Sequence, residues 1–355
     1  MSEEIRRVFE AFDLPARFIG ARPFGNGHIN DTYLIDAEIG DTPENYILQR
    51  VNSHVFRHPE QVIANVSAVT RFLAEKLSST QRDISRLVLH LNSTRQGKEY
   101  YADEQGNLFR LYDFIHGAVC LDLPESRADF YNSAVAFGNF QHLLSDFPVE
   151  TLYETIPDFH NTEKRWRDLQ KAFEKDPVGR ASQASKEWEF FSRRREFYSL
   201  LQRRHQAGEL PLRVTHNDTK LNNVMLDEKT RLPLCVIDLD TVMPGFSVHD
   251  FGDSIRFGAS TAAEDEPDLS RVHFDRSLYD TYQQGFLTGC AGDLLPEEIR
   301  LLPVGAVMMT LECGMRFLTD FLLGDGYFKT AYETHNLVRC HTQMRLAEEM
   351  EQSLL

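Results

Sequence analysis

The chain has 355 residues, 42% of them hydrophobic and 26% charged, which is typical of a folded protein with a sizeable core. A formal net charge of -16 argues against a nucleic acid or an anionic membrane as a partner, because binding their phosphates requires clustered Lys and Arg. It leaves ATP open, since a metal ion can mediate that contact. A cytoplasmic location is favoured by five scattered cysteines without a CxxC pair and by an acidic N-terminus unlike a signal peptide. The sequence indicates no protein partner.

The first third of the chain is predicted to be rich in β-strands. Short β-like runs occur at 31–37, 45–51, 87–91, 99–103 and 108–115, and the first two are separated by the turn-forming "EIGDTPE". Residues 59–77 instead place apolar side chains at i, i+4, i+7 and i+11, the spacing of a helix face. This order of elements resembles the small lobe of a kinase.

After Gly117 the pattern becomes mainly helical, apart from a β-rich island at 213–240. Helices are predicted at 128–144, 163–173, 185–206, 278–287, 296–323 and 336–352. The most apolar of them contains Pro303, Glu312 and Arg316, which favours a buried core helix over a membrane span. We therefore expect an α+β protein with a small β-rich lobe at 1–113, a hinge at 114–117 and a larger, mainly helical lobe at 118–355.

The stretch "THNDTKLNN" has the spacing of a phosphotransfer loop, H-x-D followed by Asn five residues after the Asp. In such a loop the Asp, here Asp218, accepts the proton of the attacking hydroxyl, and the Asn, here Asn223, binds magnesium. Surface turn chemistry explains a pattern this short about equally well. The flanking apolar runs predict a β-hairpin that returns Asp238 beside Asn223, with Asp240 as a further candidate metal ligand.

The tripeptide Asp250-Phe251-Gly252 is spelled like the metal-binding motif of protein kinases. Asp250 lies twelve residues beyond Asp238, however, so the hairpin cannot place it opposite Asn223. We expect Asp250 to cap a helix or brace a loop instead. His216 is expected to be structural as well.

The strings "VTHNDTKLNNVMLD" and "CVIDLDTVMPG" resemble the aminoglycoside phosphotransferase and choline kinase superfamily. Within it, "DFGDSIRFGAS", "PFGNGHINDTYLID" and "YILQRVN" resemble the N-acetylhexosamine 1-kinases over nearly the whole chain. The resemblance implies the two-lobed protein-kinase-like fold and Mg²⁺-dependent transfer of phosphate from ATP to C1 of GlcNAc or GalNAc. It implies Asp218 as base, Asn223 and Asp238 as magnesium ligands, and Asp250 as a brace for the catalytic loop.

The nucleotide site is expected in the small lobe. "GNGHIN" precedes a strand, and its Gly25, Gly27 and Asn30 are candidates for phosphate contacts, although a plain hairpin turn is the alternative. Tyr112, Phe114 and Ile115 fall where a hinge would contact adenine. The first lysine of the chain is Lys76, so the strand lysine of kinases is missing.

At the position of that lysine stands Gln49, with Arg50 beside it pointing to the opposite face of the strand. The matching helix position holds Asn65 rather than Glu. We expect a neutral contact between Gln49 and Asn65, and Gln49 is the candidate phosphate contact.

For the sugar, a neutral ligand requires convergent hydrogen bonds and an apolar wall. The candidates beside Asp218 are Arg316 and Phe257, whereas His28, Asp253 and Tyr327 are weaker. A structural ion pair with Glu312 is the main alternative for Arg316. Two other functions stay open at this point: a kinase of the same superfamily acting on another hexose, choline or homoserine, and a pseudokinase that binds nucleotide without catalysis.

Overall fold

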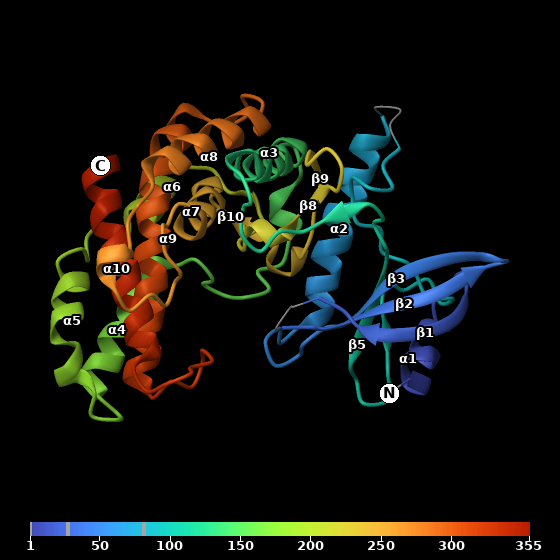
Figure 1. The fold of residues 1–355 in the computed structure, drawn as a ribbon, viewed down its shortest axis with the longest axis horizontal. Helices are drawn as coiled ribbons and strands as arrows, with labels where there is room; N and C mark the ends of the chain where they lie inside the picture. Colours follow the sequence, from blue (N-terminus) through green and yellow to red (C-terminus); the bar gives the residue numbers. More distant parts are fainter. Residues whose placement is uncertain (1, 26–28, 80–82) are drawn as a thin grey trace. The chain divides into compact units, whose positions relative to one another are not determined.

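The structure, a computed structural model, describes residues 2–25, 29–79 and 83–355, which form two compact units (Figure 1). The first unit comprises Met1–Val119, Asp146–Ile156 and Met225–Met243, and the second comprises Cys120–Ser145, Pro157–Val224 and Pro244–Leu355. Two short segments beyond the predicted hinge therefore fold with the N-terminal part of the chain. The first unit is built around a sheet and the second is mainly helical, as the predicted α+β class requires.

A five-stranded antiparallel sheet forms the centre of the first unit, in the order β1-β2-β3-β5-β4. Its strands are β1 (Arg17–Pro23), β2 (Asp31–Ile39), β3 (Thr42–Arg50), β4 (Tyr101–Ala102) and β5 (Leu108–Asp113). The turn between β2 and β3 is confined to Gly40, with φ 61°, and Asp41, so the predicted seven-residue turn is too long. The register pairs Gln49 of β3 with Arg110 of β5, which places both side chains on one face.

Two helices belong to this unit. The first, α1 (Ser2–Phe9), buries Ile5, Val8 and Phe9 in one hydrophobic cluster with residues of β2, β3 and β5. The second, α2 (Pro59–Ser78), begins with Pro at its first position and buries the predicted stripe, Val62, Val66, Val69 and Leu73. Strand β1 was not expected. The strand predicted at 87–91 is wrong, because among the described residues of this run only Leu91 forms a β-bridge, to Tyr112, and the others are not in a strand.

The predicted hairpin is present as β8 (Val224–Asp227) and β9 (Pro233–Val236), in a sheet ordered β6-β8-β9 with β6 (Ala118–Val119). Its turn is fixed by Asp227, whose Oδ1 accepts from the backbone N–H of Lys229 and Thr230. A single 3-10 turn, η4 (Leu239–Thr241), follows β9. The hairpin prediction is therefore confirmed for its strands.

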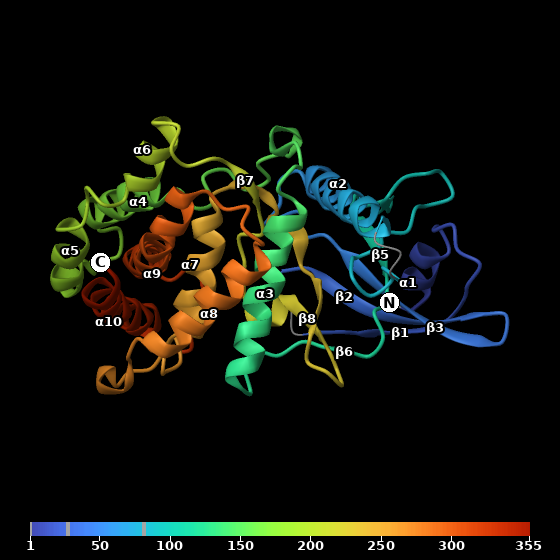
Figure 2. The ribbon, with the colours of Figure 1, turned by 90° about the horizontal axis from the view of Figure 1, so that it is seen from above.

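Helix α9 lies at the centre of the second unit and packs against α4, α7 and α10, while α8 packs against α3 (Figure 2). The helices are α3 (Arg127–Leu143), α4 (Thr162–Lys175), α5 (Ser185–Ser192), α6 (Leu200–Gln206), α7 (Ser247–Gly258), α8 (Arg276–Gly289), α9 (Pro296–Leu323) and α10 (His335–Leu354). Where α7 crosses α9 the backbones meet: a Cβ added to Gly252 would lie 2.3 Å from the carbonyl oxygen of Gly305.

By length and composition alone α9 could cross a membrane, and it is the one such helix among the residues that the structure describes. However, 89% of its most apolar window is buried against the rest of the protein. Glu312 and Asp320 are also buried within it, each with hydrogen-bond partners. These are the properties of a core helix, which agrees with the prediction for 296–323.

The helix predicted at 185–206 is interrupted, since 193–199 form turns between α5 and α6. The hydroxyl of Tyr198 donates to the carbonyl oxygen of Phe191 at 2.8 Å, and Arg194 turns to form a two-pronged ion pair with Glu351 of α10. Both contacts hold the chain in the break. The predicted catalytic loop lies between strand β7 (Arg213–Thr215) and the 3-10 turn η3 (Leu221–Asn223). Strand β7 pairs with β10 (Met243–Gly245).

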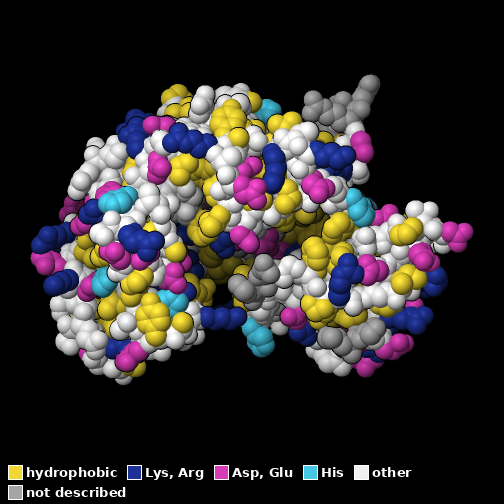
Figure 3. All heavy atoms as spheres, in the orientation of Figure 1, with side chains coloured by type: hydrophobic (Ala, Val, Ile, Leu, Met, Phe, Trp, Pro, Cys, Tyr) yellow, Lys and Arg dark blue, Asp and Glu magenta, His cyan; other side chains and the backbone are white. Residues whose placement is uncertain are grey.

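Charged side chains of both signs are interspersed on the face drawn in Figure 3. Exposed ion pairs occur in both units, for example between Arg6 and Glu10 and between Arg276 and Asp280. Exposed pairs of this kind contribute little to stability, in general less than about 1 kcal/mol each.

Candidate active site

The predicted catalytic loop of the second unit is braced by Asp250, which lies in the first turn of α7. The carboxylate of Asp250 accepts from the backbone N–H of His216 at 2.9 Å and of Asn217 at 2.8 Å, and from Nε2 of Gln141 at 2.9 Å. Asn217 adopts a left-handed conformation with φ 65°, which a residue with a Cβ holds only under constraint. Burial raises the pKa of Asp250, and the hydrogen bonds oppose that effect. Asp250 is thus not the cap residue of α7: it lies within the helix, and its carboxylate holds the catalytic loop.

Asp218, the predicted base, is half-buried and contacts two side chains of its own loop. Nζ of Lys220 lies 2.8 Å from Oδ1 of Asp218. Nδ2 of Asn223 donates to the backbone carbonyl of Asp218 at 2.8 Å and to its Oδ2 at 3.2 Å. Burial works against the charge of Lys220, but the Asp218 carboxylate outweighs it and raises the Lys220 pKa. Sequence reasoning missed Lys220, although its place two residues after the Asp was a visible signal.

Asp253, a predicted sugar ligand, has both carboxylate oxygens engaged. Oδ2 accepts from the N–H of Thr219 at 3.0 Å, and Oδ1 lies 3.1 Å from Nη2 of Arg256. Burial alone would raise the pKa of Asp253, but the surrounding positive charges, with that of Arg256 the largest contributor, have the opposite effect. The net result is a lowered pKa. Phe257, in the last turn of α7, is 36% exposed and is available as a wall for a ligand.

Arg316 and Tyr327, both candidates for the sugar site, lie close to each other. The guanidinium of Arg316 lies 5.8 Å from the ring centre of Tyr327 and 5.5 Å from that of Phe328. Asp320 of α9 holds this turn, because its carboxylate accepts from the backbone N–H of both aromatic residues. The alternative ion pair is not formed, since Glu312 contacts His160 instead, and Arg316 has no carboxylate partner in the part of the chain that the structure describes.

His160 and Glu312 were both missed as parts of the site. Nδ1 of His160 lies 2.9 Å from Oε1 of Glu312, and its Nε2 lies 3.2 Å from the carbonyl oxygen of Asn217. Their side chains are 8% and 1% exposed. The signal available in the sequence was a Glu within an apolar helix, for which an ion pair with Arg316 was one of two interpretations.

In the first unit, Gly25 and Asn30 are the described members of the predicted phosphate loop, whereas Gly27 and His28 lie outside the described residues. Gly25 has φ 78°, a conformation that favours glycine. Nδ2 of Asn30 donates to Oδ2 of Asp240 at 2.6 Å, and its Oδ1 accepts from the N–H of Asn52 at 3.0 Å.

Beside Gln49, which stands at the position of the missing lysine, lies an arginine from the neighbouring strand. Arg110 of β5 is 1% exposed and forms an ion pair with Asp240, with 2.5 Å between Nη2 and Oδ1. Its Nε and Nη2 also donate to Oε1 of Gln49 at 3.1 and 2.8 Å. Burial works against the charge, yet the Asp240 carboxylate raises the pKa of Arg110. The remaining nitrogen, Nη1, is buried without a hydrogen-bond partner among the described residues.

The expected contact between Gln49 and Asn65 is wrong. Gln49 uses its amide group on Thr32 and Arg110. Asn65 donates to the carbonyl oxygens of Tyr153 and Val242 at 2.8 and 2.9 Å, so both amide hydrogens are taken. Arg50 points away from Gln49, as the alternation of a strand predicts, and pairs with Asp31.

The predicted hinge residues are buried or packed against aromatic rings. Tyr112 and Ile115 are each 5% exposed, and burial raises the pKa of Tyr112. The backbone N–H of Phe114 donates to the carbonyl oxygen of Asn45 at 3.2 Å, and its ring meets that of Phe24 edge to face at 6.0 Å. Phe24 directly precedes Gly25, so an aromatic pair links the loop to the hinge segment.

The residues predicted to hold magnesium fit an oxygen-binding metal in part. Asn223 spends its N–H groups on Asp218, which leaves its amide oxygen as the ligand atom. Asp238 has φ 59°, a strained conformation of the kind found at functional sites. Asp240 has Oδ2 hydrogen-bonded to Asn30, whereas Oδ1 lies in the ion pair with Arg110 and is buried without a hydrogen bond among the described residues, so Oδ1 stays a candidate ligand atom. In the described parts of the chain no three His, Cys, Asp or Glu side chains cluster with ligand geometry.

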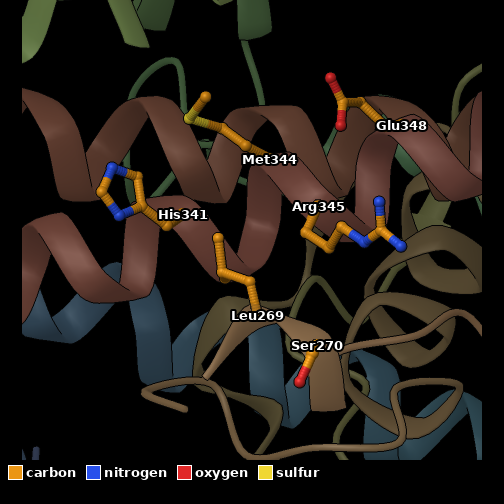
Figure 4. Close-up of a pocket in the computed structure, with 6 residues that line it drawn as sticks. All are labelled: Leu269, Ser270, His341, Met344, Arg345 and Glu348. Atoms are coloured by element: carbon orange, nitrogen blue, oxygen red, sulfur yellow. The ribbon is translucent and has the colours of Figure 1, made fainter. Parts of the chain in front are cut away.

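One further pocket of the second unit lies between the 3-10 turn η5 (Leu269–Arg271) and α10 (Figure 4). It is lined by Leu269, Ser270, His341, Met344, Arg345 and Glu348. None of these lining residues was a predicted site residue.

Comparison with known proteins gives a family and a fold. The model of the phosphotransferase enzyme family matches residues 20–285. Similar solved structures include an aminoglycoside phosphotransferase from Alicyclobacillus acidocaldarius (12% identity, TM-score 0.63, 98% of this chain and 95% of that chain). A microcompartment-associated aminopropanol kinase (16%, 0.58, 99% and 98%) and a spectinomycin phosphotransferase solved with ADP and spectinomycin (14%, 0.58, 99% and 99%) are also similar. The predicted kinase-like fold of the aminoglycoside phosphotransferases is confirmed.

Proposed function

The chain belongs to the phosphotransferase enzyme family, and from that premise we propose that it transfers the γ-phosphoryl group of ATP to the anomeric hydroxyl of an N-acetylhexosamine, GlcNAc or GalNAc. The products are the sugar 1-phosphate and ADP. The bond between O1 of the sugar and Pγ forms as the bond from Pγ to the β–γ bridging oxygen breaks, and Asp218 accepts the proton of the anomeric hydroxyl.

The charge pattern around Asp218 is the observation that favours a neutral acceptor. Each acidic group of this region already has a partner: Asp218 has Lys220, Asp253 has Arg256, Glu312 has His160, and Asp250 has backbone N–H groups. Arg316 adds a positive charge that forms no direct ion pair with a carboxylate among the described residues, although the charge of Glu312 contributes to its raised pKa. An amine acceptor such as aminopropanol or choline requires the opposite arrangement, an acidic or aromatic cage with unpaired carboxylates.

Arg316 suits a neutral sugar in two ways. Its guanidinium provides several N–H donors for hydroxyl or acetamide oxygens, and its position over Tyr327 and Phe328 restricts its rotamers. Phe257 offers an apolar wall of the kind that sugar rings pack against. This pair is our candidate for recognition of the N-acetylhexosamine.

Magnesium would be held by Asn223 and Asp238 and would neutralise phosphate charge as the phosphoryl group moves. Asp240 would act on the nucleotide side through its ion pair with Arg110, and its Oδ1, which has no hydrogen bond among the described residues, is a further candidate ligand atom. Lys220 keeps a positive charge next to Asp218 and, through the ion pair, restrains the orientation of its carboxylate.

The missing strand lysine is replaced, in this proposal, by Arg110. The guanidinium is held by Gln49 and Asp240, and its Nη1 is an unsatisfied buried donor, a state that costs free energy unless a ligand oxygen meets it. A nucleotide phosphate or a water bound to it would be such a ligand. Gln49 then positions Arg110 and does not itself bind phosphate, which weakens the argument for a pseudokinase.

The test is to incubate the protein with Mg-ATP and a panel of sugars and amines and to follow ADP release. We expect turnover with GlcNAc or GalNAc, none with choline or aminopropanol, and loss of turnover in Asp218→Asn. Turnover confined to amines would overturn the assignment of the acceptor. A folded protein that releases ADP with no acceptor in the panel would favour the pseudokinase.

A further inference from the structure

Two histidines hold the peptide group that joins Asn217 to Asp218. The carbonyl oxygen of that group lies 3.2 Å from Nε2 of His160. Its N–H, which belongs to Asp218, donates to Nδ1 of His216 at 3.2 Å. Because the peptide group is planar, the two contacts together fix the direction in which the backbone enters Asp218.

Both ring nitrogens of His160 face oxygen atoms, and this defines its protonation state. The carbonyl oxygen of Asn217 can only accept, so Nε2 must carry a proton. Nδ1 faces Oε1 of Glu312 at 2.9 Å, while Oε2 of that carboxylate accepts from the hydroxyl of Thr162 at 2.7 Å. With Glu312 ionised, both contacts are made only by the doubly protonated imidazolium.

The surrounding charges support that state. Burial would lower the pKa of His160, but Glu312 outweighs it, helped by Asp253 of α7, and the pKa is raised. Burial would raise the pKa of Glu312, but His160, with a smaller contribution from Arg165 of α4, lowers it to about 2. His249 of α7, with 5.3 Å between the two ring centres, is kept neutral, since burial and the charge on His160 lower its pKa to about 3.

We propose that Glu312 and His160 form a charged positioning pair for the catalytic base, holding the carbonyl of Asn217 so that Asp218 faces its substrate. The inference rests on the proposed function, in which Asp218 accepts the proton. Asn217 is left-handed, and the loop needs restraint from two sides to keep it so. Asp250 of α7 holds the N–H of Asn217, and the pair anchored on α9 holds its carbonyl.

Two variants separate the hydrogen bond from the charge. His160→Ala removes both, and we expect kcat to fall about 10- to 100-fold with the KM values of ATP and sugar changed less than about threefold, because a misplaced base slows the chemical step rather than binding. Glu312→Gln keeps the bond, since a Gln amide can donate to Nδ1 while Nε2 still donates to Asn217. We expect kcat at neutral pH to fall less than in His160→Ala.

The pH profile gives the more specific test. In the wild type, His160 loses its proton as pH rises through its raised pKa, after which Nδ1 and the Glu312 carboxylate repel each other, and kcat falls. In Glu312→Gln a neutral ring satisfies both contacts, so this alkaline decline disappears. A decline that is identical in the two proteins, or His160→Ala with kcat within twofold of the wild type, overturns the proposal.

The pair formed by His341 of α10 and Glu187 of α5, with 2.6 Å between Nε2 and Oε1, is a matched control. It contains the same residue types but does not contact the loop. His341→Ala should lower stability and leave kcat and its pH profile unchanged.

A measurement without substrate keeps this inference separate from the proposed function. In the ¹⁵N spectrum of the intact protein at pH 7, we expect His160 to show two protonated ring nitrogens, and Glu312→Gln to show one. A neutral His160 in the wild type refutes the pair even where sugar turnover is observed. An imidazolium without any turnover refutes the proposed reaction but not the pair.

Discussion

The ion pair between Arg110 and Asp240 is buried to an extent that makes its removal costly. The two side chains are 1% and 5% exposed. Removing one partner of such a pair costs about 3–5 kcal/mol, because the other charge is left buried without compensation. We expect Arg110→Met to lower the melting temperature by on the order of 10 °C, from the usual relation between stability and melting temperature for a domain of this size.

The double variant Arg110→Met with Asp240→Asn separates stability from nucleotide binding. It should recover much of the lost stability, because no unpaired charge is then buried. It should not recover binding of Mg-ADP, because the donor Nη1 is gone. The assay is thermal unfolding with and without Mg-ADP, in which binding raises the melting temperature.

A matched control is Arg50→Met on β3, which removes a half-exposed pair with Asp31 and should cost less than about 1 kcal/mol. An unchanged melting temperature in Arg110→Met would refute the reasoning about the buried pair. A double variant that binds Mg-ADP like the wild type would refute the role of Arg110 at the phosphates.

Further predictions concern the metal, the brace and pH. Asp238→Ala should leave the melting temperature without ligand nearly unchanged but remove stabilisation by Mg-ADP; full stabilisation would contradict a ligand role. Asp250→Ala should lower the free energy of unfolding by several kcal/mol, because each buried N–H donor left unpaired costs about 1–3 kcal/mol. An unchanged free energy of unfolding would contradict this. The stability contributed by His160 is fully present below about pH 6.5 and is lost as the pH rises through the raised pKa of His160. The stability contributed by Glu312 is fully present above about pH 4.5 and is lost as the pH falls toward 2. The difference in melting temperature between wild type and His160→Ala should therefore be largest between about pH 4.5 and 6.5; a difference that keeps growing at alkaline pH would contradict this.

Features that depend on neighbours in the sequence were predictable. The apolar stripe of α2 appears where the helical period places it, and α9 has the predicted bounds Pro296–Leu323. The β8–β9 hairpin was visible as two apolar runs around a turn. In each case the signal lies within a few residues, where period and turn chemistry decide the local conformation.

Contacts between distant parts of the chain were not predictable in the same way. Arg110 occupies a polar position in a strand, and nothing near it in the sequence points to Asp240 as its partner. His160 and Glu312 are 152 positions apart and meet only through the packing of α9 against the segment before α4. The Gln49–Asn65 expectation failed for the same reason, since Asn65 found backbone partners far away in the sequence.

The central claim is that the anomeric hydroxyl of an N-acetylhexosamine receives the phosphoryl group. The most direct measurement is the ³¹P NMR spectrum of the products formed from Mg-ATP and GlcNAc or GalNAc, in which coupling of phosphorus to the anomeric proton identifies the site of transfer. We predict a sugar 1-phosphate that appears with the wild type and is absent with Asp218→Asn. A sugar phosphorylated at any other hydroxyl, or no phosphorylated sugar while an amino alcohol is phosphorylated, would contradict the account.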